Sequence, residues 1–174
     1  MANGTLKVGE ITTSTGSGNI TIGSGVTLLS NTPAVEAYLS STQTISDATV
    51  TKVSFDSEIL DTDSCFDSST NYRFTPNRSG KYFISANLRG GGGGTTLDII
   101  QVYIRKNGSD ITNTFSQSRF NGNYIQNVMC EKTSIVELNG TTDYVEIYAY
   151  VDLTSGSPEV NSDGSSLIIY RIGA

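Results

Sequence analysis

The sequence predicts an all-β protein, and three observations support this. Between residues 82 and 88 every second position is apolar, which is the period of a half-buried strand. Asn-Gly pairs at 107–108, 121–122 and 139–140 separate apolar runs, and this pair is the strongest short signal for a hairpin turn. Gly, Ser, Thr and Asn are abundant, and no segment keeps a helical apolar period over ten or more residues.

The stretch 72–88 is the centre of the predicted fold. Residues 72–74 form a short strand that ends at Pro76, because proline cannot donate to a strand ladder. A turn follows in which Gly80 can adopt a positive φ angle. Since the short strand and the alternating strand after the turn both need partners, the stretch predicts a domain of two sheets.

Further strands follow one another from Thr32 onward. We expect them near 34–39, 49–56, 70–75, 80–89, 96–106, 111–119, 124–138, 142–152 and 165–172. In 145–151 the odd positions are aliphatic and the even positions are Glu or Tyr, so one face packs inside a sandwich and the other is outward and aromatic. A chain of 174 residues holds one well-filled core, so we expect residues 32–174 to form one head domain.

Residues 1–31 differ in pattern from this domain. Apolar positions alternate in two short units separated by Thr-Ser-Thr-Gly-Ser-Gly, and a hairpin of this size is only marginally stable alone. We predict an anchoring arm that docks on another body by strand pairing and apolar burial. The predicted docking residues are Leu6, Val8, Ile11, Ile20 and Ile22. A disordered tail is the alternative.

Charge and composition exclude several classes of function. A net charge of −6 without a Lys/Arg cluster argues against nucleic acid binding, because phosphate contacts need a positive surface. No apolar run is long enough for insertion into a membrane. The first residues lack the apolar core of a signal peptide, so we expect no export through a secretory translocon.

Enzymatic chemistry is not predicted either. The sequence has no histidine, which removes the usual nucleophile systems and the commonest metal ligand. Cys65 and Cys130 alone do not make a zinc site; we interpret them as buried free thiols, with a disulfide as the alternative. Ser79-Gly80-Lys81 lacks the upstream glycine of a phosphate-binding loop. We predict no catalytic residue, no metal and no cofactor.

Two features leave a choice between interpretations. The acidic residues Asp56, Glu58, Asp61, Asp63 and Asp67 are interpreted as a solvated loop, because the spacing of a known calcium loop is absent, with a calcium site as the alternative. The glycines Gly90, Gly91, Gly92, Gly93 and Gly94 are either a plain hairpin tip or a recognition loop.

The order of motifs resembles the globular heads of complement and collagen-like proteins and the tumour necrosis factor family. The central match is Phe74, Pro76, Gly80, Tyr82 and Phe83, and it extends through Lys-Asn-Gly at 106–108 to the last strand near 165–168, covering about residues 34–172. The resemblance implies a jelly-roll sandwich that forms a homotrimer. The trimer interface we expect is the aromatic face with Tyr103, Tyr144, Tyr148, Tyr150 and Tyr170, and the alternative is a plain exposed face.

The opening Met-Ala-Asn-Gly-Thr-Leu-Lys-Val resembles those of small structural proteins of bacteriophages, notably of marine and cyanobacterial phages. Together the resemblances imply a non-enzymatic virion protein, assembled in the host cytoplasm. We expect a trimeric capsid decoration or cement protein that contacts itself and other virion proteins. The alternatives are a short tail fibre or receptor-binding protein that recognises a host glycan or protein, and a secreted ligand-like or lectin-like binding module.

Overall fold

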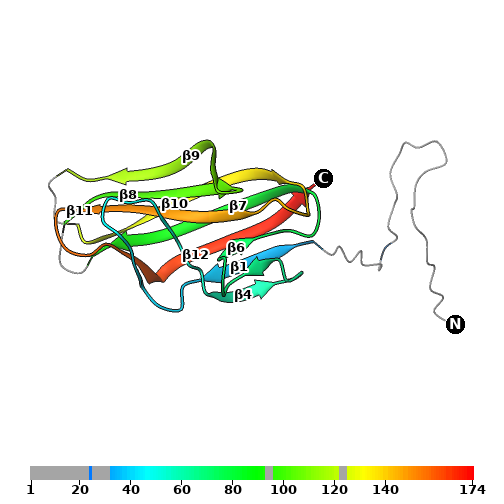
Figure 1. The fold of residues 1–174 in the computed structure, drawn as a ribbon, viewed down its shortest axis with the longest axis horizontal. Coiled ribbons are helices and arrows are strands. Elements are labelled where there is room, and N and C mark those ends of the chain that lie inside the picture. Colours follow the sequence, from blue (N-terminus) through cyan, green and yellow to red (C-terminus); the bar gives the residue numbers. More distant parts are fainter. Residues whose placement is uncertain (1–23, 25–31, 93–95, 122–124) are drawn as a thin grey trace. The chain divides into compact units, whose positions relative to one another are not determined.

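The computed structural model describes residue 24 and residues 32–92, 96–121 and 125–174. Residues Thr32–Ala174 form one compact unit (Figure 1). The predicted docking residues Leu6, Val8, Ile11, Ile20 and Ile22 lie outside the described residues, as do Gly93 and Gly94. The arm therefore remains a prediction.

The first sheet has six antiparallel strands, and its main path runs in the order β10-β7-β12-β1-β4, while β2 pairs with β12. The bounds are β1 Ala34–Tyr38, β2 Gln43–Thr44, β4 Ser57–Asp61, β7 Gly80–Gly91, β10 Asn127–Leu138 and β12 Glu159–Gly173. β10 lies at one edge of this sheet and β4 at the other.

The second sheet also has six antiparallel strands, in the order β5-β6-β11-β8-β9, with β3 paired to β11. The bounds are β3 Thr51–Lys52, β5 Phe66–Asp67, β6 Arg73–Phe74, β8 Leu97–Lys106, β9 Ser109–Arg119 and β11 Val145–Leu153. Its edge strand β9 and the edge strand β10 of the first sheet contact each other on the same side of the sandwich.

The alternation read from the sequence sets the inner faces of the sheets. In β7 the side chains of Tyr82, Ile84, Ala86 and Leu88 are buried, and the residues between them are half-buried. In β11 the aliphatic positions are buried, and Tyr148 and Tyr150 are half-buried on the outside. These inner faces form one continuous hydrophobic core, so the predicted all-β sandwich is confirmed.

The short strands differ from the prediction. Of the predicted strand 49–56 only β3 is a strand, while Val53 and Phe55 are fully buried without belonging to one. Both side chains belong to the hydrophobic core, and the Val53 amide donates to the Ile147 carbonyl oxygen of β11 at 2.9 Å. β4 was not predicted, because apolar and polar residues do not alternate in Ser-Glu-Ile-Leu-Asp. In the structure its residues are not buried alternately either, and Ile59 and Leu60 are exposed. The two-residue strands β2 and β5 were missed as well.

The glycine run is partly strand. Gly90 and Gly91 belong to β7 and are buried, and each pairs with both β10 and β12. This corrects the expectation that all five glycines form a loop. These two positions are glycine because the packing around the strand has no space for a side chain. A Cβ on Gly90 would lie 2.5 Å from Ile100 Cδ1, and one on Gly91 would lie 1.8 Å from the Gln126 carbonyl oxygen.

Candidate interaction surfaces

An apolar row crosses the outer face of the first sheet. The register places Ile135 of β10 beside Phe83 of β7, Phe83 beside Tyr170 of β12, and Tyr170 beside Ala34 of β1. The rings of Phe83 and Tyr170 are in contact, with centroids 5.2 Å apart. Ile135 is 60% exposed and Tyr170 is 42% exposed, so these large apolar side chains face solvent.

Exposed apolar neighbours extend this row on the same face. We call the set the stripe, and its members are Ile135, Phe83, Tyr170, Ile168, Ile172, Tyr38 and Leu60. Contiguous exposed apolar surface of this kind marks interaction sites in soluble proteins. The stripe is therefore the strongest candidate for a contact surface in the described part of the chain.

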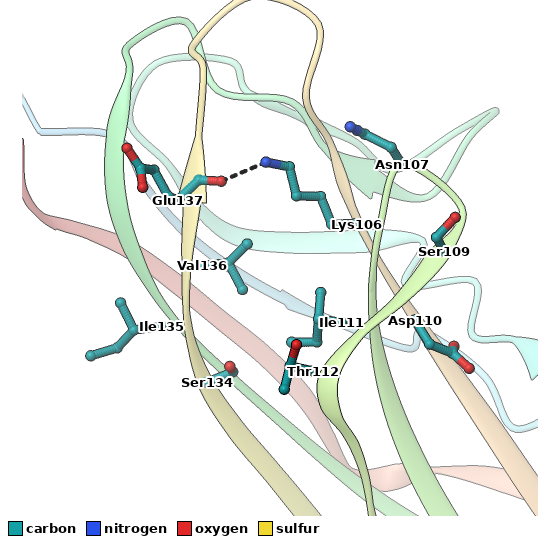
Figure 2. A pocket seen from close by; sticks show the side chains of 10 residues that line it. All are labelled: Lys106, Asn107, Ser109, Asp110, Ile111, Thr112, Ser134, Ile135, Val136 and Glu137. Carbon is teal, nitrogen blue, oxygen red and sulfur yellow. Dashed lines mark hydrogen bonds between the residues drawn. The ribbon is translucent and has the colours of Figure 1, made fainter.

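A groove of about 660 Å³ lies between the edge strands β9 and β10. Figure 2 shows Ile111 of β9 and Val136 of β10 pointing into the space between the two strands, while Lys106 donates to the Glu137 carbonyl oxygen at 2.8 Å. Ile135 lines the groove as well, and in Figure 2 it lies on the opposite side of β10. Apolar surface thus continues from the stripe around the β10 edge into the groove.

The outer face of the second sheet carries most of the predicted trimer residues. Tyr148 pairs with Tyr103 in the register, Tyr150 pairs with Gln101, and all three tyrosines are half-buried. Tyr144 precedes β11 and is also half-buried. Tyr170 instead lies on the first sheet, so the five tyrosines predicted as one interface are divided between two faces.

The rings on the second sheet already have partners within the chain. The Arg105 guanidinium carbon lies 4.3 Å from the Tyr148 ring centroid, and that of Arg73 lies 4.3 Å from the Tyr144 ring centroid. Burial raises the pKa of the Tyr103 phenol, and this hydroxyl donates to Gln101. Compared with the stripe, this face is polar and internally bonded, which is the character of a solvated or ligand-contacting surface.

The acidic residues predicted as a solvated loop or a calcium site are engaged separately. Asp56 accepts hydrogen bonds from the Ser40 amide and hydroxyl at 2.7 and 2.6 Å. Asp61 accepts from the amides of Cys65 and Phe66 at 3.0 and 2.9 Å. The remaining members are Asp63, which lies 3.7 Å from Arg78 Nε, Asp67, which caps a turn, and Glu58, which is exposed.

These separate roles leave no shared cavity of carboxylates. Among residues 32–92, 96–121 and 125–174, no group of three or more His, Cys, Asp or Glu side chains is arranged to hold a metal ion. Cys65 and Cys130 are buried and free, and burial raises the pKa of both thiols. In the same residues no helix is long and apolar enough to cross a membrane.

Asp67 gives an expectation about pH. Its carboxylate accepts from the amides of Thr70, Ser69 and Asn71, which holds its pKa well below its usual range. Because the folded pKa is the lower one, the stabilisation is present at neutral pH and is lost as pH falls below about 4, the unfolded value. We expect Asp67→Asn to flatten the fall of the free energy of unfolding between about pH 4 and pH 2.

Denaturant unfolding at a series of pH values measures this effect. Asp163→Asn is the matched control, because Asp163 is an exposed carboxylate whose ionic partner is Arg89. Equal slopes for the wild type and Asp67→Asn would contradict the assignment.

Comparison with known proteins gives a clear result for the fold. No protein-family model and no curated protein matches the chain. The globular domain of zebrafish complement 1qA protein is similar over 81% of this chain and 97% of its own, with a TM-score of 0.61 and 14% identity. The Eiger tumour necrosis factor of S. frugiperda is similar over 83% of this chain and 94% of its own, with a TM-score of 0.57 and 11% identity.

A third similar structure is murine APRIL at pH 5.0, which matches over 81% of this chain and 99% of its own, with a TM-score of 0.59 and 8% identity. At such identities the likeness establishes the fold alone. The predicted jelly-roll sandwich of the complement-head and tumour necrosis factor type is confirmed.

Proposed function

We propose that the chain is a non-enzymatic structural protein that self-associates as a homotrimer and serves as a capsid decoration or cement protein of a bacteriophage. The observation that carries self-association is the stripe on the first sheet, which leaves large apolar side chains facing solvent. The virion assignment is supported by the opening of the sequence, with its phage-like Met-Ala-Asn-Gly-Thr-Leu-Lys-Val.

In this proposal the two parts of the chain have different tasks. The stripe holds three copies together, because each copy contributes the same apolar patch and closed symmetry repeats the contact. Residues 1–31, with Leu6, Val8, Ile11, Ile20 and Ile22, attach the trimer to other virion proteins. The outer face of the second sheet, which includes Tyr103, remains turned to solvent.

Substitution of Tyr170 by lysine tests self-association. We expect light scattering to give the mass of a trimer for the wild type at micromolar concentration. For Tyr170→Lys we expect the protein concentration at which half of the trimers dissociate to rise about 30-fold or more, since buried tyrosines at interface centres contribute about 2 kcal/mol or more. Tyr150→Lys on the second sheet is the matched control and should keep the wild-type mass. A monomeric wild type would overturn the proposal of self-association.

Gold labelling of purified particles tests the virion assignment. Label over the capsid supports a decoration protein, and label at the tail tip supports the alternative of a receptor-binding protein. No label on particles would reject both. Adding the full chain and a chain without residues 1–31 to particles depleted of the protein then tests the arm, because only the full chain should rebind.

The receptor-binding alternative is favoured by the outer face of the second sheet. Tyr103 and Phe115 have ring centroids 5.2 Å apart, and Gln101 hydrogen-bonds to Gln117 beside them. Half-exposed rings next to amide groups suit the flat, hydroxylated surface of a glycan. Binding of purified host polysaccharide that is lost in Phe115→Ala and Gln117→Ala would support this alternative.

A further inference from the structure

A second, smaller pocket, of about 240 Å³, lies at one end of the outer face of the second sheet. The residues that line it are Asp98, Ile99, Arg119, Phe120, Asn121 and Asp152. The register sets Asp152 of β11, Ile99 of β8 and Arg119 of β9 side by side across three strands. The stripe belongs to the other sheet, so the self-association proposed above does not use this pocket.

A β-bulge shapes the pocket. The register pairs Ile99 with Asp152 but Leu97 with Leu153, so β8 carries one residue more than β11 at this point, and that residue is Asp98. A bulge takes its extra residue out of strict alternation, and bulges are frequent beside functional sites. Ile99 lies two residues before the outward-facing Gln101, hence on the outer face, yet it is only 8% exposed and forms the floor.

The polar side chains of the pocket carry hydrogen-bonding groups that the fold does not use. Asp98, Arg119 and Asn121 form no side-chain hydrogen bond and no ion pair with other described residues. Elsewhere on the same face such groups are engaged, as in the hydrogen bond between Gln101 and Gln117. The pocket therefore offers both acceptors and donors to a ligand that brings both.

The charges of the pocket limit the class of ligand. Two carboxylates, those of Asp98 and Asp152, stand against the single guanidinium of Arg119, so an anionic ligand meets net repulsion. The same negative surroundings act on the next outward residue of β11: burial, together with the carboxylates of Asp152 and Asp47, raises the pKa of the Tyr150 phenol. A divalent cation is repelled by Arg119 and finds no group of three acidic or other metal-binding side chains in the described part of the chain. An uncharged ligand with several hydroxyl groups meets neither obstacle.

The rest of this face suits the same ligand class. The contacting rings of Tyr103 and Phe115 lie on the same two strands, four residues from the pair of Ile99 and Arg119. At roughly 3.3 Å per residue this separation is about 13 Å, a distance that a short oligosaccharide spans. Aromatic rings offer flat apolar surface to the C–H face of a sugar. The pocket and the rings therefore lie along one continuous path.

We propose that the pocket binds a neutral hexopyranose, as one unit of a glycan that continues along the face toward the rings. Hydroxyl groups of the sugar donate to the carboxylates of Asp98 and Asp152. They accept from the Arg119 guanidinium and the Asn121 amide, while the apolar side of the sugar ring rests on Ile99. The inference rests on the receptor-binding alternative proposed above for this face, and it adds the sugar class and the residues that select it.

Nuclear magnetic resonance titration of the full chain with free sugars tests the pocket. The probes are the methyl glycosides of glucose, galactose and mannose, with glucuronic acid as the charged counterpart. We expect at least one neutral glycoside to shift the Asn121 side-chain amide signal saturably, and glucuronate to bind about tenfold more weakly or worse. The Asn139 side-chain amide, which donates to Thr142, is the internal control and should not shift. No saturable shift with any neutral glycoside, or tighter binding of glucuronate, overturns the proposal.

Substitution of the two carboxylates tests the selection. Asp152→Ala should weaken binding of the neutral sugar about tenfold or more, because a hydrogen bond to a charged group contributes that much. Asp98→Asn combined with Asp152→Asn removes both negative charges, so glucuronate should then bind at least as tightly as the neutral sugar. Asp163→Ala on the first sheet is the matched control and should bind like the wild type. Thermal unfolding verifies that each variant folds, and Asp152→Asn replaces Asp152→Ala if the latter does not.

The outcomes separate this inference from the function on which it rests. Unchanged sugar binding in Asp152→Ala, or continued rejection of glucuronate by the double variant, overturns the pocket. Host polysaccharide binding that depends on Phe115 and Gln117 but not on Asp152 also overturns it, and leaves the receptor-binding alternative standing. A wild type that binds neither sugars nor host polysaccharide rejects both, and gold labelling then decides the decoration role separately.

Discussion

Replacement of Phe74 by alanine is expected to lower the free energy of unfolding by about 3 to 5 kcal/mol, the range for a fully buried phenylalanine. Phe74 has no exposed surface, and its ring meets that of Tyr82 edge to face with centroids 5.4 Å apart. Strand β6 has only two residues, so few ladder bonds hold it in place once the ring is lost. The cavity would open between β6 and its neighbours, where Phe74 pairs with Phe66 and Val145.

Denaturant unfolding at one fixed protein concentration measures this loss, because a self-associating protein changes its apparent stability with concentration. Phe115→Ala is the matched control. Phe115 is 43% exposed and contacts only the Tyr103 ring among the aromatic pairs, so we expect a loss of about 1 kcal/mol or less. A cost for Phe74→Ala no larger than this would show that the Phe-x-Pro-x-x-x-Gly-x-Tyr stretch is not the centre of the core.

The long strands could be predicted because their information is local. The alternation in β7 and β11 fixes which side chains are buried, and Asn107-Gly108 specifies a tight hairpin with positive φ angles of 54° and 76°. The short strands β2 and β4 carry no such pattern. Their pairing with β12 and β1 depends on residues far away in the chain, which a periodicity cannot reveal.

The contact surface illustrates the same limit. Tyr103, Tyr148 and Tyr150 could be recognised as outward-facing from alternation alone, and so could Tyr170. That Tyr170 stands in one row with residues from three other strands follows only from the register of the first sheet. The sequence therefore indicates that outward aromatic residues exist, while the strand order decides which of them form a continuous patch.

Replacement of Gly140 by alanine is expected to lower the free energy of unfolding by roughly 2 to 5 kcal/mol, from a left-handed backbone and a steric clash together. Gly140 has a φ angle of 73°, and a Cβ there would lie 2.2 Å from the backbone carbon of Arg78 and from the amide nitrogen of Ser79. The loop cannot move away cheaply, because Asn139 Oδ1 accepts three amides, those of residues 141–143, at 2.9 to 3.0 Å. Either this cap or the turn before β7 has to give way.

Gly108→Ala separates the two contributions. Gly108 also has a positive φ angle, of 76°, but a Cβ there meets nothing closer than the Tyr144 hydroxyl at 3.6 Å. We therefore expect it to lose only the conformational part, about 1 to 2 kcal/mol. Equal losses in the two variants would mean that the loop at Gly140 moves away from Arg78 without cost, and that the contact between the turn before β7 and the β10–β11 loop does not stabilise the sandwich.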